Sequence, residues 1–326
     1  NISFEDITLD SPNKNYVGCV SKNESNNINN ISLNNISCNG NTNVAGFIAS
    51  MGEKNCTDIK GDNIHITGKG DYVGGIFGSI SCSNYSSATI TKNISVENSE
   101  IKGRNYVGGV YGYGRVNNAT SNNNIVSGVN YVGGVSGNSY VNSYNVYASD
   151  VQVTGSGSNI GGLVGYKNSL RYGRIVDSIV EGTTYNTTNV GGVAGGSAQT
   201  FEYIEVNNVK VLNKGNYVGG FIGRTDAGNT SNVIYNYIQD SYVEGNNYIG
   251  GLIGCVQTGN VYYNYSDTEI KATGENIGGI TGYIKNENTT TISDNRIEIH
   301  NNYVIGSKIK GIRNIGGLIG RTDKEL

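Results

Sequence analysis

The chain has 326 residues, enough for one or two ordinary domains. Charged residues make up 15% of it and the net charge is −3, and Lys and Arg form no cluster of the kind that binds nucleic acid. No stretch approaches 18 apolar residues, so we expect no membrane span. With 49 Gly, one Met and no long amphipathic run, the composition argues against helices.

The N-terminal part predicts strands of uneven quality. Residues 2–9 largely alternate apolar and polar side chains, which is the pattern of a half-buried strand. The Asn-rich run at 23–37 is a weaker strand prediction, because only Ile31 and Leu33 keep the alternation. Residues 16–60 as a whole form two degenerate copies of a repeat that continues along the rest of the chain.

The repeat is a Gly-Gly unit such as Asn216-Tyr217-Val218-Gly219-Gly220-Phe221-Ile222-Gly223. Successive copies lie about 30 residues apart on average, within the range of stacked repeats. Gly18 and Ala45 begin the two degenerate copies. The nine better copies begin at Gly74, Gly108, Gly133, Gly161, Gly191, Gly219, Gly250, Gly278 and Gly316.

A second segment in register with the glycines, such as Asp240-Ser241-Tyr242-Val243-Glu244-Gly245, gives each copy two or three short strands. Such a unit cannot bury its apolar side alone, so stacking is required. We therefore predict an all-β, parallel β-solenoid, a right-handed β-helix of about 11 coils of roughly 30 residues. A β-propeller is the alternative, but its blades need about 40–45 residues and antiparallel strands.

Stacking places like side chains above one another, and two apolar ladders follow. One contains Val107, Val132, Ile160, Val190, Val218, Ile249, Ile277 and Ile315; the other contains Phe221, Leu252, Ile280 and Leu318. We expect the paired glycines at a bend or at a closely packed face. Asn and Asp at the turns tolerate left-handed backbone angles and should stack as amide ladders.

Composition does not shift along the chain, so we predict one domain over residues 1–326, with degenerate coils at 1–60 and regular coils at 61–326. The longest interval, between Gly278 and Gly316, predicts a protruding loop or an extra strand pair around residues 287–291. Because the chain starts without Met and shows no signal peptide, we expect a fragment of a longer protein.

The five cysteines leave at least one thiol without an intrachain partner. Cys56 and Cys82 occupy similar positions in neighbouring coils, so a disulfide between them is one reading. The other is that the thiols are buried small apolar residues. Composition does not decide between these states for Cys19, Cys38, Cys56 and Cys82. No Cys-x-x-Cys pair is present, which argues against a zinc or redox site.

The sequence contains no catalytic motif. His65 and His300 are the only histidines and form no His-Glu-x-x-His, and their alternating surroundings predict outward side chains rather than members of a triad. Asp150, Asp177, Asp240 and Asp267 fall near one phase of the repeat, which allows either stacked carboxylates or ordinary turn residues. No Gly-Gly-x-Gly-x-Asp repeat of the calcium-roll kind occurs. We predict no catalytic residue, metal or cofactor.

Tyrosine is the remaining signal, with 24 Tyr and no Trp. One set precedes the glycines, and we expect it to pack as a ladder: Tyr16, Tyr72, Tyr106, Tyr131, Tyr217 and Tyr248. A second, clustered set predicts a surface patch for a sugar or protein partner. The candidate binding residues are Tyr140, Tyr144, Tyr147, Tyr235, Tyr237, Tyr262, Tyr263 and Tyr265.

The segments Gly251-Leu252-Ile253-Gly254 and Gly317-Leu318-Ile319-Gly320 resemble the bacterial GLUG repeat, and the resemblance extends over residues 13–322. The resemblance implies a secreted or cell-surface bacterial protein. Such repeats occur in adhesin-like proteins and in non-catalytic regions of IgA-specific metallopeptidases. The repeats carry no catalytic residues, so the resemblance assigns none here.

These observations predict a non-catalytic adhesion module of a bacterial surface, a rigid solenoid that contacts a host surface or matrix protein or a glycan. Two alternatives stay open. One is the accessory region of a large surface metallopeptidase whose zinc domain lies outside this chain, and the other is a β-helix polysaccharide lyase or hydrolase that uses the in-phase acids. The identity of the ligand and the oligomeric state are not encoded in any motif.

Overall fold

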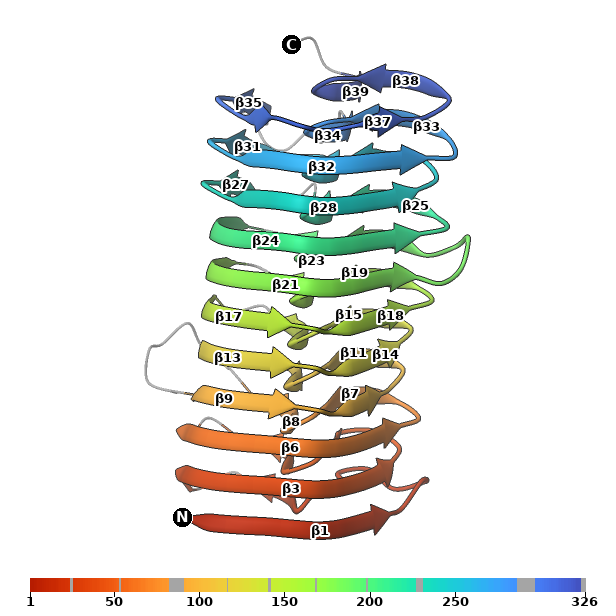
Figure 1. Ribbon diagram of the computed structural model, residues 1–326. Helices are drawn as coiled ribbons and strands as arrows, with labels where there is room; N and C mark the ends of the chain where they lie inside the picture. The colour runs from red at the N-terminus through yellow and green to blue at the C-terminus, as the bar shows by residue number, and fades with distance from the viewer. Residues whose placement is uncertain are drawn as a thin grey trace, which may run out of the picture.

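The computed structural model describes residues 1–23, 26–52, 54–81, 91–115, 117–139, 142–167, 169–197, 199–226, 231–285 and 297–323. These residues form strands and turns without a helix, and their strands pair in parallel in three sheets. The chain rises from the N-terminus at one end of a stack to the C-terminus at the other (Figure 1). The predicted parallel β-solenoid is therefore confirmed; the right-handed sense and the number of coils stay predictions.

Sheet A includes the longest strands of the structure and has 18 strands in the described residues. They are β1 (Ile2–Asp10), β3 (Ile28–Gly40), β6 (Cys56–Gly68), β9 (Thr91–Glu97), β10 (Glu100–Lys102), β13 (Asn117–Asn122), β14 (Ile125–Gly128), β17 (Ser143–Ser149), β18 (Gln152–Gly155), β21 (Leu170–Gly182), β24 (Thr200–Asn213), β27 (Asn232–Ile234), β28 (Tyr237–Gly245), β31 (Gly259–Tyr262), β32 (Tyr265–Ala272), β35 (Ile297–His300), β36 (Tyr303–Val304) and β37 (Ile309–Lys310).

Sheets B and C contain short strands. Sheet B consists of β4 (Val44–Ala45), β7 (Asp71–Gly74), β11 (Asn105–Gly108), β15 (Asn130–Gly133), β19 (Ser158–Gly161), β22 (Thr188–Gly191), β25 (Asn216–Gly219), β29 (Ile249–Gly250), β33 (Glu275–Gly278) and β38 (Arg313–Gly316). Sheet C consists of β2 (Val20–Asn23), β5 (Ile48–Met51), β8 (Phe77–Ile80), β12 (Tyr111–Tyr113), β16 (Ser136–Ser139), β20 (Val164–Lys167), β23 (Ala194–Ser197), β26 (Ile222–Thr225), β30 (Ile253–Val256), β34 (Thr281–Ile284) and β39 (Ile319–Thr322).

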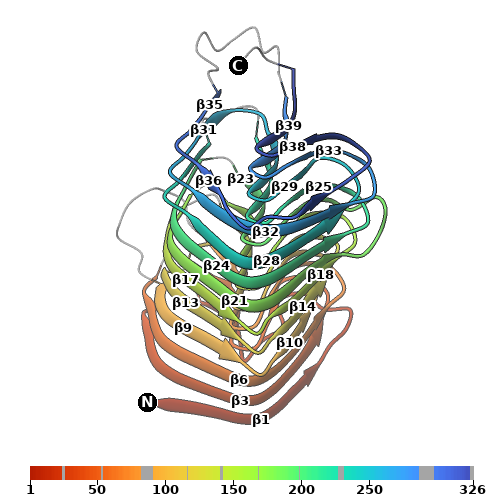
Figure 2. The same ribbon diagram turned by 45° about the horizontal axis from the view of Figure 1, so that its top comes forward.

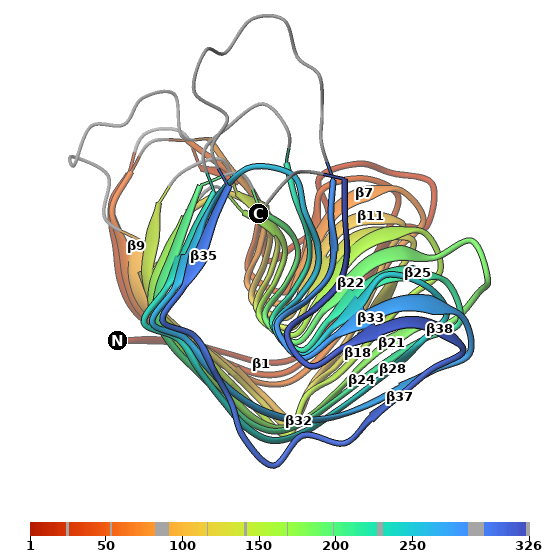
Figure 3. The same cartoon turned by 90° about the horizontal axis from the view of Figure 1, so that it is seen from above.

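Each turn of the chain passes through sheet A, then B, then C, and the three sheets surround a common interior (Figure 3). The first residues of the Gly-Gly units stand in register in sheet B from Ala45 through Gly74 to Gly316. The valine and isoleucine ladder predicted one residue earlier occupies the adjacent register position. The glycine pair therefore recurs once per turn at the same place.

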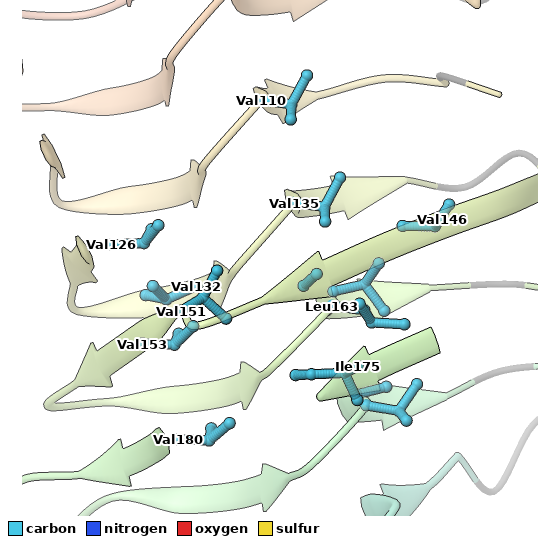
Figure 4. Packing of buried hydrophobic residues seen from close by; sticks show 14 of the residues in the cluster. Val110, Val126, Val132, Val135, Val146, Val151, Val153, Leu163, Ile175 and Val180 are labelled. Carbon is cyan, nitrogen blue, oxygen red and sulfur yellow. The ribbon is translucent and has the colours of Figure 1, made fainter. Parts of the chain in front are cut away.

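Apolar side chains from all three sheets fill the interior (Figure 4). Val107, Val132 and Ile160 are fully buried, as are Phe221 and Leu252 of the second predicted ladder. Ile315 and Leu318 are exceptions, with 48% and 55% of their surface exposed. They belong to the last turn in the structure, where no further turn covers them.

Each turn bends at corners where the backbone is left-handed. Among the described residues, 30 non-glycine residues have positive φ, and all of them are Asn, Asp or Tyr. The predicted role of Asn and Asp is confirmed, whereas the use of Tyr at the same corners was not anticipated. The corners stack, so that each forms a column of residues, one per turn. The long strands of sheet A are visibly bent (Figure 2).

The corners also explain a weak strand prediction. Strand β3 includes most of the Asn-rich run, and Ile36 is buried together with Ile31 and Leu33. Asn35 has φ 54° and forms a corner between Leu33 and Ile36. The corner shifts the alternation by one residue, so the apolar pattern looks broken in sequence although the strand continues. The predicted loop around 287–291 lies outside the described residues.

The paired glycines are required because two backbones approach closely. A Cβ on Gly134 would overlap the carbonyl oxygen of Gly162 in the next turn, and a Cβ on Gly109 would overlap the carbonyl oxygen of Gly134 in the same way. Neither glycine is left-handed, so the need is for space and not for unusual angles. This confirms the prediction of a closely packed face.

We expect Gly134→Ala to lower the free energy of unfolding by roughly 3 kcal/mol, since backbone must move to admit the methyl group. Gly317→Ala is the matched control, because it changes the equivalent glycine of the last turn, where a Cβ would meet nothing within 4 Å. Thermal unfolding of both variants tests this. Equal melting temperatures would contradict the close-packing explanation.

A second prediction concerns the left-handed corners. Asn118 has φ 50°, and its exposed side chain bonds to neighbours in its column. Asn118→Val should be less stable than Asn118→Gly by about 1–2 kcal/mol. Both variants lose the amide, but only valine has a side chain that clashes with the backbone in the left-handed conformation. Urea unfolding measures the difference, and a valine variant as stable as the glycine variant would refute it.

Candidate functional site

One corner column of sheet A carries a stack of exposed tyrosines. Tyr172, Tyr203, Tyr235 and Tyr263 occupy this corner in four successive turns, all with φ of 55° to 57°. Their ring centroids are 5.3, 5.3 and 5.2 Å apart, with interplanar angles of 9°, 4° and 2°. Between 45% and 50% of each residue is exposed. The four rings thus form an ordered aromatic strip on the surface.

The same column is an amide ladder in earlier turns. Asn93 donates to Asp58 over 2.8 Å, Asn118 to Asn93 over 3.1 Å, and Asn145 to Asn118 over 2.7 Å. Asn145 lies one turn before Tyr172. The column therefore changes from polar to aromatic while the backbone corner stays the same.

Buried asparagines hold the corner behind the tyrosines. Asn236 and Asn264 follow Tyr235 and Tyr263 directly, and both are buried. The Nδ2 of Asn236 donates to the carbonyl of Phe201 and to Oδ1 of Asn264, over 3.1 and 3.0 Å. Because these bonds link one turn to the next, the rings project from a braced backbone rather than from a free loop.

Two further outward columns flank the strip. On one side, Tyr147, Arg174, Glu205, Tyr237, Tyr265 and Tyr303 follow one another in register. Within this column Tyr237 and Tyr265 stack at 4.6 Å, and Arg174 pairs with Glu205 at 3.2 Å.

The column on the other side of the strip begins with Tyr144 and contains an Arg171–Glu202 pair at 2.5 Å. It continues through Ile234 to Tyr262, whose ring stacks at 4.8 Å on His300, the next residue in register. Tyr262 also packs edge-on against Tyr263, so this column is continuous with the corner strip. We name the whole surface the tyrosine face: Tyr144, Tyr147, Tyr172, Tyr203, Tyr235, Tyr237, Tyr262, Tyr263, Tyr265 and Tyr303.

Seven of the eight candidate binding residues lie on the tyrosine face, and the eighth, Tyr140, lies outside the described residues. The sequence reasoning missed Tyr172, Tyr203 and Tyr303. Tyr172, Tyr203, Tyr235 and Tyr263 are spaced by about one repeat, so aligning the copies on the corner rather than on the glycines would have found the first two.

The tyrosines that precede the glycines form the predicted packed ladder. Tyr72, Tyr106 and Tyr131 stack at 5.0 and 4.8 Å, and Tyr217 stacks on Tyr248 at 4.8 Å. Tyr16, at the first turn, is more exposed, and Lys22 lies over its ring with Nζ 4.4 Å from the centroid.

Three of the four in-phase acids occupy left-handed corners, and the fourth, Asp267, lies in strand β32. Asp150, Asp177 and Asp240 have φ of 52°, 50° and 49°, and Asp177 accepts a hydrogen bond of 2.7 Å from Asn208 in the next turn. Asp267 lies beside the left-handed Gly306. The left-handed backbone is that of turn residues, so the structure favours the prediction of ordinary turn residues over that of stacked carboxylates.

Both histidines are exposed, as predicted. Nε2 of His65 is 2.9 Å from Oδ1 of Asn63, and His300 stacks on Tyr262. Among the residues that the structure describes, no three His, Cys, Asp or Glu side chains gather in a way that could hold a metal ion. The described part also contains no helix long and apolar enough to cross a membrane.

No protein-family model matches this chain, and neither a curated protein nor a solved structure matches it significantly. The similarity to the GLUG repeat therefore stays a prediction from the sequence.

The four described cysteines are thiols that form no disulfide bond: Cys19, Cys38, Cys56 and Cys255. Cys38, Cys56 and Cys255 are buried, which agrees with the reading of these thiols as small apolar residues. Cys82 lies outside the described residues, and Cys56, its possible partner, is in the thiol form. Burial raises the pKa of the Cys38 and Cys56 thiols to about 12.

We expect Cys38 and Cys56 to resist a thiol reagent at pH 8 in the folded protein, because the reactive thiolate is scarce well below its pKa and the side chains are covered. When urea unfolds the protein, both thiols should become accessible and react with the reagent. Peptide mass spectrometry after short labelling, with the half-buried Cys19 as internal comparison, measures this. Rapid native labelling of Cys38 or Cys56 would contradict the buried positions.

Proposed function

We propose that this chain is a non-catalytic adhesion module of a bacterial cell-surface protein, and that the tyrosine face contacts a host protein or glycan. The observation that supports this most is the exposed strip of Tyr172, Tyr203, Tyr235 and Tyr263 with its flanking tyrosines. Tyrosine is enriched among the residues that dominate binding energy, because it offers a large apolar ring and a hydroxyl at low entropic cost.

The rigidity of the strip favours a binding role. Each inner ring is held between two others, and the corner behind them is tied by buried amides. Side chains that are already ordered lose little freedom when a partner arrives, so more of the contact energy appears as affinity. Ion pairs between Arg171 and Glu202 and between Arg174 and Glu205 border the strip. They supply the polar rim that is typical of interfaces.

The surface location and the bacterial origin are parts of the same proposal and rest on the resemblance to the GLUG repeat. A stalk built of identical turns carries its binding face at a fixed distance and orientation from its attachment.

The test uses a glycan array and an array of immobilised host extracellular-matrix proteins. The double variant Tyr203→Asn/Tyr235→Asn removes two rings from the centre of the strip and keeps the left-handed corner, since Asn occupies the same column at Asn118 and Asn145. We expect at least a tenfold loss of affinity for the strongest ligand found.

The control is Tyr72→Asn/Tyr106→Asn, which makes the same change in the packed column of sheet B, where Asn43 has the same conformation. Binding should survive in this control. Wild-type protein that binds nothing on either array, or a double variant that binds as well as wild type, would refute the proposal.

A further inference from the structure

The packed tyrosine column of sheet B is interrupted for two turns. Tyr131 ends one stack and Tyr217 begins the next, and Asn159 and Asn189 occupy the two corners between them. All four residues are left-handed, so the backbone is the same whether the corner holds Tyr or Asn. Only the side chains are shorter, and the column therefore has a gap two residues long.

Sheet C has a glycine opposite this gap. Tyr166, Gly196 and Arg224 follow one another in register, so the middle turn contributes no side chain. A Cβ on Gly196 would lie 2.8 Å from Oδ1 of Asn159 and 2.8 Å from the Tyr166 ring. The result is an open cavity of about 360 Å³ lined by Tyr131, Asn159, Tyr166, Asn189, Arg224 and Asp226, within the size range of small-molecule sites.

The polar groups of the cavity are incompletely used. Asn189 donates to Asn159 over 3.0 Å, but its own Oδ1 is buried and has no hydrogen-bond partner. The physical reason is that the next residue in the column, Tyr217, has no amide to donate. A buried acceptor without a donor is costly. Rotation of the Asn189 amide toward the cavity would let a ligand hydroxyl donate to it.

The two charged residues are already oriented. Asp226 accepts a hydrogen bond from the hydroxyl of Tyr166. Arg224 uses Nε to donate to Gln257 over 2.6 Å, and its guanidinium lies over the Tyr217 ring, 5.4 Å from the centroid. The two terminal nitrogens of the Arg224 guanidinium are then available to a ligand. They can donate side by side to two neighbouring oxygen atoms.

The cavity also has an aromatic wall. Tyr106 stacks on Tyr131 at 4.8 Å, and Tyr166 packs edge-on to Tyr131 at 6.3 Å. The Tyr131 ring is thus fixed from two sides while it lines the cavity. The surface that faces the cavity is almost wholly polar, with amide, guanidinium and carboxylate groups beside the fixed tyrosines, and it suits a compact ligand that carries several hydroxyls.

We propose that this cavity binds a neutral pyranose sugar. Asn159, Asn189 and Arg224 would bond its hydroxyls, Asp226 would accept from one of them, and Tyr131 would border the ligand. The Asp226 carboxylate disfavours an anion such as phosphate, and a plain aromatic side chain leaves Asn189 Oδ1 without a donor. This site lies on sheets B and C and is separate from the tyrosine face on sheet A.

The experiment titrates the full chain with methyl β-D-glucopyranoside, methyl β-D-galactopyranoside, methyl α-D-mannopyranoside and N-acetylglucosamine, followed by saturation-transfer NMR and calorimetry. Inorganic phosphate and tyrosinamide are tested in parallel. We expect at least one pyranoside to bind, and Asn189→Tyr to weaken it more than tenfold, because the new ring fills the gap in the column.

The matched control is Asn314→Tyr, the same substitution in the same column at an exposed corner far along the stack. It should bind the sugar as wild type does. Should Asn189→Tyr fail to fold, Asn189→Gly keeps the left-handed corner and removes the amide, and Arg224→Gln removes the charge; each should weaken binding at least fivefold.

Binding of tyrosinamide or phosphate without any pyranoside would overturn the proposal, as would full sugar affinity in Asn189→Tyr, or absence of binding by every probe. The double variant Tyr203→Asn/Tyr235→Asn separates the two sites, since it should lose array binding through the tyrosine face and keep the pyranoside affinity of the cavity.

Discussion

The structure depends on the parallel hydrogen bonding of each strand to the equivalent strand one turn above and below it. Parallel strands in register place equivalent residues about 4.8 Å apart, so the side chain at one position is in contact with the side chain at the same position of the next turn. Apolar side chains then form buried ladders, amides bond to amides, and tyrosine rings stack. The corners and the glycine pairs are the places where this register has to be kept while the chain changes direction.

Much of the stacking could be predicted from the sequence, because aligning the copies of the repeat shows which residues pair between turns. The Gly-Gly units aligned the copies, and the valine and isoleucine ladder around Val107 and Val218 followed. The alternation of apolar and polar residues is interrupted at corners such as Asn35, where a left-handed residue shifts the pattern by one position. The tyrosine strip was only partly foreseen, because tyrosine at a left-handed corner contradicts ordinary propensity, and Tyr172 and Tyr203 were not recognised as members of the column.

Asn, Asp and Tyr share the left-handed corners, so they can replace one another without altering the path of the chain. The scaffold and its surface chemistry are thereby separated. In one column a run of Asn gives way to a run of Tyr and creates the exposed tyrosine face. In another, two Asn interrupt a run of Tyr and open the cavity beside Arg224. Both candidate sites are thus variations in the order of corner residues, which a residue-by-residue search for catalytic motifs does not detect.

The direction of the backbone hydrogen bonds has a mechanical consequence. Bonds between turns point along the long axis, while the covalent chain runs around it. Tension applied between the two ends would load the hydrogen bonds of one turn at a time, so an end turn peels away before the next is strained. A sideways force is instead shared by many turns through the common interior. Such a rod is stiff against bending and yields gradually when it is stretched.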